Sequence, residues 1–445
     1  MRPGAGAPAG CGASAGAAHP LIGCKIERLP AILSRGGITM KAHQITDSVY
    51  AIHADIHTDA RFEGIWPIPN GVTLNSYVVK GEKTALIDLA KDWAGSIGQF
   101  DQQLASAGTS FEAIDYLVLN HLEPDHTAFL IELRKRNPKA EIISTPKGIA
   151  LVKNFFKITD NLREVKTGDT LDLGKDTVLE FFETPNIHWP ETMMTFDRKN
   201  GILFSCDGFG SYGALGERIF DDEFTAKEHD FFEHESLRYY ANIVASFSSF
   251  VNKALDKLGA LPVKVIAPSH GIIWRKNPAE IVSRYAKYAG YNTGTAPCEK
   301  EICVVWGSMY GYTRAGLEAV LDGIRAEGVP FTIHQVPDTD ASFVLADAYK
   351  AAGLVLAMPT YEYKMFPPMA HILDLFERKH FTGKKVLRLG SWGWVGGAKK
   401  EYEERIASFK WTSVESVEWQ GVPSQADLSL LTERGRELAR LIKEN

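Results

Sequence analysis

Cysteine is scarce in this chain, and none occurs in the spacing that a metal–sulfur module needs. The 445 residues include five cysteines, and no two of them form a Cys-x-x-Cys pair. Rubredoxin and iron–sulfur modules hold their metal through paired thiolates, so the sequence predicts neither as an appended domain. Scarce, unpaired cysteines also suit a reducing compartment, and we expect a cytoplasmic protein.

Excess positive charge and long apolar runs are missing as well. The formal net charge is -6, whereas binding to a phosphate backbone needs clustered Lys and Arg. We therefore expect no nucleic-acid partner. No run of 18 apolar residues occurs, so the sequence predicts no transmembrane helix and no membrane partner.

The chain is long enough for several domains, and 45% of its residues are hydrophobic. We place an N-terminal segment at 1–39, a first domain at 40–289, a linker at 290–299 and a second domain at 300–445. The segment 1–39 is rich in Gly and Ala and cannot bury a core. It is a flexible tail, a transit peptide or, as we favour, an extension from a translation start placed upstream of Met40.

The densest set of metal-ligand residue types is His121-Leu122-Glu123-Pro124-Asp125-His126. It follows the apolar run Tyr116–Leu119, which predicts a buried strand leading into a short loop that Pro124 stiffens. Structural zinc favours thiolates and imidazoles, whereas a mixture of imidazoles and carboxylates suits iron or manganese. The alternative is a polar loop with solvated charges.

Three further candidate ligands also stand where apolar runs end. His188 lies in a turn between two β-rich runs, Asp207 follows the run 201–206, and His270 follows the run 263–269. Each alone would more often be a packed histidine or a capping aspartate. Their recurrence at strand ends predicts one shared metal site.

The second half of the chain contains a pattern typical of a phosphate site. A strand over Ile302–Trp306 leads through Gly307 into the loop Ser308–Thr313, and a helical pattern runs from about Arg314 to Ala326. Backbone N–H groups at such a helix start bind phosphate. The loop has neither Gly-x-Gly-x-x-Gly nor a Walker lysine, so it lacks the fingerprints of a dinucleotide site and of a P-loop. Its run of hydroxyl-bearing residues resembles the loops that hold the monophosphate of FMN in flavodoxins. An ordinary strand–turn–helix connection is the alternative.

Two later strand ends add aromatic and glycine-rich loops, after Leu354–Ala357 and after Val386–Leu389. Ligands of open α/β sheets bind beyond the carboxyl ends of the strands. We place Tyr361 and Trp392 next to a flavin ring, with a role in an interface as the alternative. The residues assigned to the cofactor are Ser308, Met309, Tyr310, Gly311, Tyr312, Thr313, Pro359, Thr360, Tyr361, Glu362, Tyr363, Ser391, Trp392, Gly393, Trp394 and Gly396.

With these motifs in both halves, the chain resembles the flavodiiron proteins over most of its length. The resemblance implies an α/β fold, in which an N-terminal αββα metallo-β-lactamase-like sandwich is followed by a flavodoxin-like doubly wound parallel sheet. Hydrolases of the sandwich fold usually have a second histidine where Glu123 stands. A carboxylate there makes the site harder and favours iron over zinc.

The same resemblance implies the cofactors FMN and two iron ions, and it assigns the ligands. One iron is expected at His121, Glu123 and His188, and the other at Asp125 and His270, with Asp207 between them. His126 either binds the second iron or turns away from it. No catalytic residue is expected beyond these ligands.

One departure concerns the segment Phe62-Glu63-Gly64-Ile65. Many members of the family have Phe-His-Gly-Tyr there, and that histidine lies near the irons. Its role therefore cannot be transferred to this chain. Tyr212 either lies near the pocket or packs in the core.

The resemblance implies an oxidoreductase that takes electrons from an external donor such as rubredoxin. FMN passes them to the iron pair, which reduces O2 to water, NO to N2O, or both. The flavin and the irons are expected to meet across a head-to-tail homodimer or a dimer of dimers. The Trp392–Trp394 loop is a candidate part of that interface.

Two other functional classes remain open. One is a zinc hydrolase of the metallo-β-lactamase type fused to a flavodoxin domain, in which a metal-bound water attacks an ester or amide. The other is an electron-transfer or redox-sensing protein with a vestigial metal site. Glu123 argues against the first, and the complete ligand set argues against the second.

Overall fold

The structure is a computed structural model that describes residues 40–93 and 95–444. The N-terminal segment of the sequence analysis, 1–39, lies outside the described residues. The strands form three large sheets and one two-stranded ribbon. Two of the large sheets come from the first 268 residues, and the third comes from residues beyond 298.

The first sheet has seven strands in the order β1-β2-β3-β4-β5-β6-β7. Its strands are β1 (His43–Thr46), β2 (Val49–Ile56), β3 (Val72–Lys80), β4 (Thr84–Ile87), β5 (Tyr116–Val118), β6 (Glu141–Ser144) and β7 (Leu162–Glu164). The pairing is antiparallel up to β4 and parallel from β4 to β7. β5 is fully buried, as expected from its apolar run, and it leads directly to His121.

The second sheet has the order β12-β11-β10-β9-β8. Its strands are β8 (Thr170–Asp172), β9 (Val178–Glu183), β10 (Met193–Asp197), β11 (Ile202–Cys206) and β12 (Val265–Pro268). Because β11 and β12 are parallel neighbours, their carboxyl ends lie on the same edge of the sheet. Asp207 and His270 follow those two ends.

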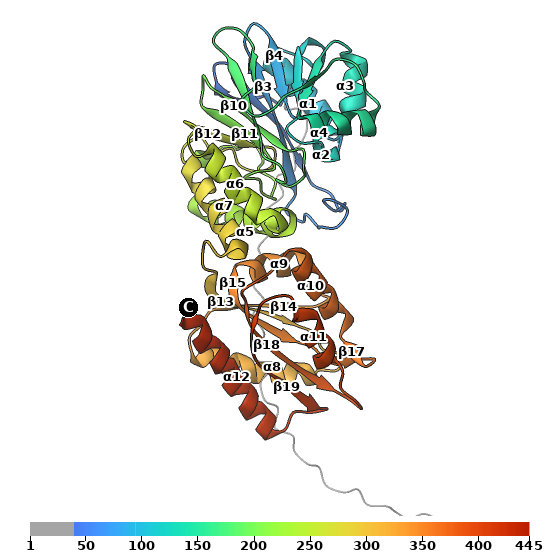
Figure 1. Ribbon diagram of the computed structural model, residues 1–445, viewed down its shortest axis with the longest axis vertical. Coiled ribbons are helices and arrows are strands. Elements are labelled where there is room, and N and C mark those ends of the chain that lie inside the picture. Colours follow the sequence, from blue (N-terminus) through green and yellow to red (C-terminus); the bar gives the residue numbers. More distant parts are fainter. Residues whose placement is uncertain (1–39, 94, 445) are drawn as a thin grey trace, which may run out of the picture. The chain divides into compact units, whose positions relative to one another are not determined.

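Helices cover the outer face of each sheet (Figure 1). The first sheet carries α1 (Ser96–Ser106), α3 (Leu130–Arg136) and α4 (Pro146–Leu151), whereas α2 (Pro124–Thr127) is a single turn after β5. The second carries α5 (Ala226–Tyr239), α6 (Ser248–Leu258) and α7 (Pro278–Thr293). This αββα sandwich confirms the fold predicted for the first part of the chain.

The third sheet is parallel, with the strand order β14-β13-β15-β18-β19. Its strands are β13 (Glu299–Trp306), β14 (Phe331–Gln335), β15 (Ala351–Ala357), β18 (Lys385–Trp392) and β19 (Thr412–Gln420), and the ribbon pairs β16 (Thr360–Tyr361) with β17 (Lys364–Met365). The helices are α8 (Tyr312–Ala326), α9 (Ala341–Lys350), α10 (Pro367–Arg378), α11 (Ala398–Ile406) and α12 (Gln425–Lys443). Numbered along the chain, this is the order 2-1-3-4-5 of flavodoxin-like sheets, which confirms the second predicted fold.

Two features differ from the sequence-based expectation. The sequence from about Lys227 to Leu258 has the pattern of one long amphipathic helix, but α5 ends at Tyr239. A π-helical turn (Tyr240–Val244) and a 3-10 turn (Ala245–Phe247) separate it from α6. Helix α7 continues to Thr293, into the expected linker. Helical periodicity does not reveal such a break, because all five residues of the π-helical turn are buried, like those of a helix in the core.

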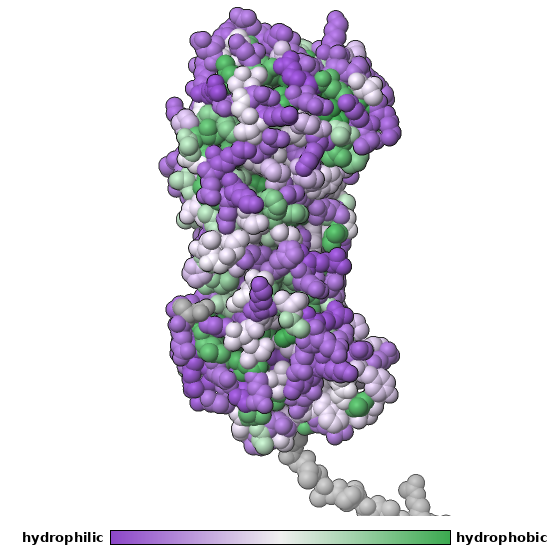
Figure 2. Space-filling model, viewed as in Figure 1, coloured by the Kyte–Doolittle hydropathy of each residue, from purple (hydrophilic) through white to green (hydrophobic). Residues whose placement is uncertain are grey.

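The described residues include no helix that is both long and apolar enough to span a membrane. On the face drawn in Figure 2, hydrophobic residues occur as small patches among hydrophilic ones. The apolar side chains lie mainly between the layers, where β3, β11 and β15 are almost entirely buried.

Candidate metal centre

Four of the candidate ligands come from the segment after β5. Its end is not a loop, as the sequence suggested, but the single helical turn α2, with Pro124 at its first position and Glu123 as the extended residue before it. Proline suits the first turn of a helix, because its missing N–H would have no partner there. The turn places Asp125 and His126 beside Glu123, and all three are buried.

The other three candidate ligands stand on connections of the second sheet. His188 lies between β9 and β10, Asp207 follows β11, and His270 follows β12. All three side chains are buried. The structure therefore brings together all seven residues that the sequence singled out.

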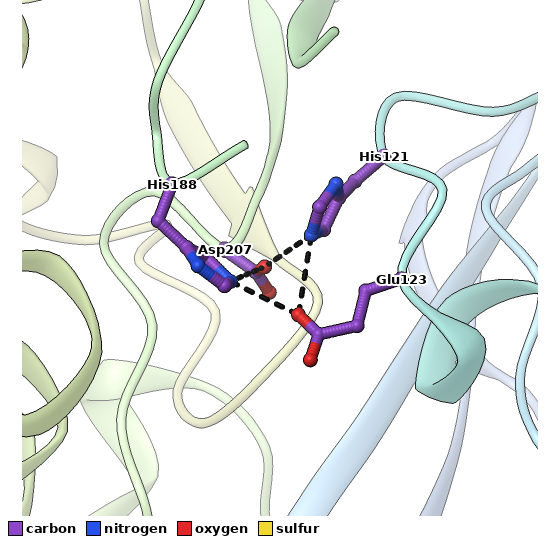
Figure 3. Close-up of side chains that lie close together, drawn as sticks. All are labelled: His121, Glu123, His188 and Asp207. Carbon is purple, nitrogen blue, oxygen red and sulfur yellow. Dashed lines mark hydrogen bonds and ion pairs between the residues drawn. The ribbon is translucent and has the colours of Figure 1, made fainter. Parts of the chain in front are cut away.

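One group consists of His121, Glu123, His188 and Asp207, whose ligand atoms all lie within 4.8 Å of one another. Glu123 Oε2 is 3.3 Å from His121 Nε2 and 3.0 Å from His188 Nε2. Asp207 Oδ2 is 3.3 Å from each of those nitrogens. Figure 3 shows the four side chains converging on one point: His121 and Glu123 come from one segment, and His188 and Asp207 come from two others.

A second group consists of Asp125, His126 and His270. Asp125 Oδ2 is 3.2 Å from His270 Nε2, and Asp125 Oδ1 is 3.5 Å from His126 Nε2. Asp207 also reaches this group, because its Oδ1 lies 2.9 Å from His126 Nε2 and 3.3 Å from His270 Nε2. The Asp207 carboxylate thus directs one of its oxygens toward each of the two groups. His126 points into the centre rather than away from it.

Several of these atoms lack a hydrogen-bond partner although they are buried. His188 Nε2, His270 Nε2 and both Asp125 oxygens have charged neighbours but no partner in hydrogen-bond geometry. Buried polar atoms without partners need an explanation, and a cation at each group supplies one. Four imidazoles and three carboxylates are a donor set that fits two iron ions.

The charges of the centre compensate one another without a metal. Burial alone would lower the pKa of His188 and His270, but the neighbouring carboxylates raise these pKa values to about 9 and about 10. Burial would raise the pKa of Asp207, yet the surrounding imidazoles hold it well below its usual range. In the metal-free protein these imidazoles therefore hold protons at neutral pH that a metal ion would displace.

A cavity of about 260 Å³ opens beside the centre. Its lining residues are Ala60, Arg61, Phe62, Glu63, Gly64, Lys91, Trp93, Glu123, Pro124 and Asp125. Glu63 accepts a hydrogen bond from Trp66 Nε1 at 3.1 Å. Burial of the Glu63 carboxyl, together with the charge of Glu123, raises its pKa above the ordinary 4.5.

The residues assigned to the flavin gather at the carboxyl ends of three adjacent strands, β13, β15 and β18. The hydroxyl groups of Thr313 and Ser391 lie 2.9 Å apart, and Ala398 N donates to Thr360 Oγ1 at 3.3 Å. The rings of Tyr363 and Trp394 meet edge-on, with centroids 6.4 Å apart. Strand β18 continues to Trp392, so Ser391 and Trp392 belong to the strand rather than to the loop after it.

The start of α8 offers a site for a phosphate group. Gly311 precedes the helix with a positive φ of 91°, and its N–H donates to Ser308 Oγ at 3.0 Å. Helix N-termini of this kind bind anions through free N–H groups. Around it, Tyr310, Tyr363 and Trp394 are 85%, 63% and 73% exposed. Such exposed aromatic side chains are suited to stacking on a planar ring.

Comparisons with known proteins agree with this geometry. A family model described as ODP family beta lactamase matches residues 72–271. The anaerobic nitric oxide reductase flavorubredoxin of Pectobacterium atrosepticum is 35% identical over 377 residues, which cover 83% of this chain and 71% of that protein. The chain belongs to the flavodiiron proteins.

Solved structures of this family have the same fold. The rubredoxin oxygen:oxidoreductase of Desulfovibrio gigas superposes with a TM-score of 0.83 at 27% identity, covering 91% of this chain and 99% of that one. The flavodiiron protein of Giardia intestinalis gives a TM-score of 0.83 at 25% identity, covering 92% and 98%. These matches extend over both parts of the chain. They do not favour the alternative of a zinc hydrolase fused to a flavodoxin domain.

Sequence reasoning missed the residues behind the flavodiiron centre. Glu191 Oε1 lies 2.7 Å from His121 Nδ1 and accepts a hydrogen bond from Leu122 N at 3.1 Å. The buried Asp88 carboxylate accepts hydrogen bonds from Asn120 N and Asn120 Nδ2 at 2.8 and 3.1 Å. No motif marks such partners, because they are distant in sequence and have no fixed spacing from the ligands.

Tyr212 has a packing role in this structure. Its side chain is fully buried, its ring stands edge-on to those of Phe62 and Tyr239, and the Arg238 guanidinium lies 4.4 Å from its centroid. Phe62 in turn stands edge-on to His270, with centroids 5.5 Å apart. Tyr212 therefore supports the wall of the centre through Phe62.

Proposed function

We propose that this flavodiiron protein reduces O2 to water, NO to N2O, or both, with electrons that an external donor delivers through FMN to a two-iron centre. The observation that carries the proposal is Asp207, which faces one complete ligand group with each carboxylate oxygen. A flavodoxin-like sheet with exposed aromatic side chains in the same chain supplies the place for FMN. A hydrolase would have no use for a flavin.

We assign one iron to His121, Glu123 and His188, and the other to Asp125, His126 and His270, with Asp207 between them. When bound, the irons and the flavin supply the electron transfer to the gas. We further propose that residues 40–289 form the iron-binding domain and residues 300–445 the FMN-binding domain, joined by the segment after α7.

The chain's own residues hold the ligands in place and provide protons. His270 Nδ1 lies 2.9 Å from the backbone oxygen of Thr73, which fixes its ring with Nε2 toward the centre. Reduction of either gas consumes protons. Glu63 lies in the cavity wall with a raised pKa, so its carboxyl retains a proton at higher pH than an ordinary glutamate and can deliver it into the cavity.

Variants of the bridging carboxylate test the proposal. Asp207→Asn should abolish consumption of O2 and NO by chemically reduced protein and lower its iron content, while FMN remains bound. Glu183→Gln is the control, because Glu183 ends β9 in the same sheet, while its side chain accepts a hydrogen bond from Thr167 instead of reaching the centre. Gas consumption by Asp207→Asn at the wild-type rate, or no consumption by iron-loaded wild type, would contradict the proposal.

We also propose that FMN of one chain serves the irons of a second chain in a head-to-tail homodimer, alone or within a dimer of dimers. The cavity beside the metal centre is lined by residues 60–64, 91, 93 and 123–125, and no flavin-loop residue is among them. The exposed aromatic side chains Tyr310 and Trp394 suit an interface.

Mixing two inactive variants tests this arrangement. Asp207→Asn disables the iron pair of one chain, and Ser308→Asp in the other chain places a negative charge against the flavin phosphate. Co-refolded or co-expressed mixtures should regain activity, because the intact flavin site of one chain then lies next to the intact iron site of the other chain. Each variant alone should be inactive. Mixed dimers without activity would show that each chain works alone.

The proposal also covers the electron donor and the cellular compartment. We expect a small redox protein such as rubredoxin as donor, because the described part of the chain holds its cysteines as the free thiols Cys206, Cys298 and Cys303 rather than in a metal-binding pair. Free thiols also suit the cytoplasm. Reduction of FMN by added rubredoxin, followed by stopped-flow absorbance, tests the donor.

A further inference from the structure

The two ligand groups have matched donors but different partners behind them. Each group has two imidazoles and one carboxylate of its own, and Asp207 serves both. The first group has Glu123, and the second has Asp125. The atoms that face the metals therefore give no reason for the two positions to differ.

The difference lies behind the imidazoles. His121 Nδ1 is 2.7 Å from Glu191 Oε1, and both side chains are completely buried. In the second group, His270 Nδ1 is 2.9 Å from the Thr73 backbone oxygen. One ring is thus held by a carboxylate and the other by a neutral carbonyl. In both, the proton on Nδ1 leaves Nε2 free for a metal.

The position of Glu191 is fixed on several sides. Its Oε1 also accepts a hydrogen bond from Leu122 N at 3.1 Å, and its backbone oxygen accepts one from Thr145 Oγ1 at 2.8 Å. Its other carboxylate oxygen, Oε2, is buried and has no hydrogen-bond partner. The carboxylate therefore interacts with the centre mainly through His121.

We propose that Glu191 is a positioning residue that makes the two iron positions electronically unequal, so that the iron bound by His121 is the harder one to reduce. The inference rests on the proposed function, because it assumes iron in both groups. It concerns only the order in which the two positions accept electrons.

The physical reason is the charge on the hydrogen-bond acceptor. A carboxylate behind a ligand imidazole raises the basicity of the ligand more than a carbonyl does. A more basic ligand, with a buried negative charge behind it, stabilises the higher oxidation state of its metal. The first electron should therefore go to the position of Asp125, His126 and His270, and the second to the position of His121.

Redox titration of the purified holoprotein, followed by electron paramagnetic resonance, tests the inference. Wild type should show two separate one-electron steps for iron. Glu191→Gln preserves the length of the side chain and an acceptor oxygen for His121 and Leu122, but it removes the charge. The lower step should then move upward by at least a tenfold change in the reduction equilibrium, about 59 mV for one electron, and the upper step by less.

Asp88→Asn is the matched control. Asp88 is also a buried carboxylate near the centre, but its hydrogen-bond partners are Asn120 and Ser269 rather than a ligand imidazole. Its substitution should move the lower step less than Glu191→Gln does. Equal shifts in the two variants, or a larger shift of the upper step in Glu191→Gln, would overturn the inference.

Two further measurements ensure that every outcome either supports or contradicts the inference. If Glu191→Gln binds fewer than two irons, the redox titration of wild type tests the inference by itself. Two iron steps at the same potential in wild type would contradict unequal iron positions. Metal and flavin contents and gas consumption are measured on the same samples. Wild type without iron or FMN would refute the proposed function, whereas an active two-iron protein with an unmoved lower step in Glu191→Gln refutes this inference alone.

Discussion

The Oδ1 atom of Asp207 lies 2.9 Å from Nε2 of His126, although 81 residues separate the two along the chain. The contact joins the end of β11 to the helical turn after β5, and so joins the two sheets at the centre. Asp207→Asn keeps the shape of the side chain but removes its charge. We expect metal to bind at least about tenfold more weakly, since even substitution of outer partners costs that much.

Metal competition measures this effect without reference to activity. Zinc affinity of the metal-free protein, measured against a chelator of known affinity, should fall in Asp207→Asn and stay at the wild-type value in Glu183→Gln. Equal affinity in wild type and Asp207→Asn would place the metals elsewhere.

Metal binding should release protons. The pKa values of His188 and His270 are raised to about 9 and about 10 by neighbouring carboxylates, so both imidazoles carry protons at pH 7 in the metal-free protein. A metal ion must displace them. Titration calorimetry with zinc in buffers of different ionisation enthalpy should give more than one proton released at pH 7. Binding without proton release would contradict these shifts.

The same shifts predict how metal-free stability depends on pH. A histidine whose folded pKa lies above its unfolded value, near 6.5, stabilises the fold fully below pH 6.5 and loses that contribution as pH rises through the folded pKa. The Tm of the metal-free protein should therefore fall between about pH 7 and pH 10. The metal-loaded protein should show a flatter profile, because its ligands are already deprotonated.

Glu63→Gln should separate a stability effect from a catalytic one. The raised pKa of Glu63 means that its ionisation opposes folding above the ordinary value of 4.5, so the variant should have a higher Tm at pH 7 and an unchanged Tm near pH 4. If Glu63 supplies protons, turnover should nevertheless fall by about 100-fold and lose its decline toward high pH.

Glu82→Gln serves as the control for Glu63→Gln, since Glu82 lies in the β3–β4 turn away from the cavity. Full activity of Glu63→Gln across the pH range would exclude a proton-delivery role. An unchanged Tm at pH 7 would exclude the raised pKa.

Two glycines in the flavin region should respond differently to alanine. A Cβ on Gly390 would lie 1.8 Å from the Met358 backbone oxygen, whereas a Cβ on Gly393 would have no atom within 4 Å. Gly390→Ala must push apart the ends of β15 and β18, at a cost of about 1–3 kcal/mol. Gly393→Ala should change stability by less than about 0.5 kcal/mol.

Thermal unfolding and FMN titration by fluorescence quenching measure both variants. Gly390→Ala should also bind FMN more weakly, because Gly390 directly precedes Ser391 and Met358 stands two residues before Thr360, both of which we assign to the flavin. Equal behaviour of the two variants would mean that the strand ends are not packed as closely as described.

Sequence patterns singled out, at the ends of strands, the candidate ligands that the structure brings together. His121, His188 and His270 each follow or link apolar runs, and a strand end aims its next side chain at the sheet edge. The ligand types and the fold class were therefore accessible from the sequence. So was the hydroxyl-rich loop before α8, since a strand, a glycine loop and a helix start form a local pattern.

Features set by contacts distant in sequence were not accessible. Glu191 looks like any polar turn residue until the fold brings it to His121, and Glu63 becomes a cavity residue only through its neighbours Trp66 and Glu123. The break after Tyr239 was also hidden, because the residues of the π-helical turn are as buried as those of a helix. The segment that begins at Pro124 was expected to be a loop, but it forms a helical turn.

Metal and flavin content of the protein, produced with iron available and purified without oxygen, tests the central claim most directly. The account predicts about two irons and one FMN per chain, and consumption of O2 or NO once the protein is reduced. Two zinc ions, or no bound flavin, would contradict it and restore a hydrolase as the leading interpretation.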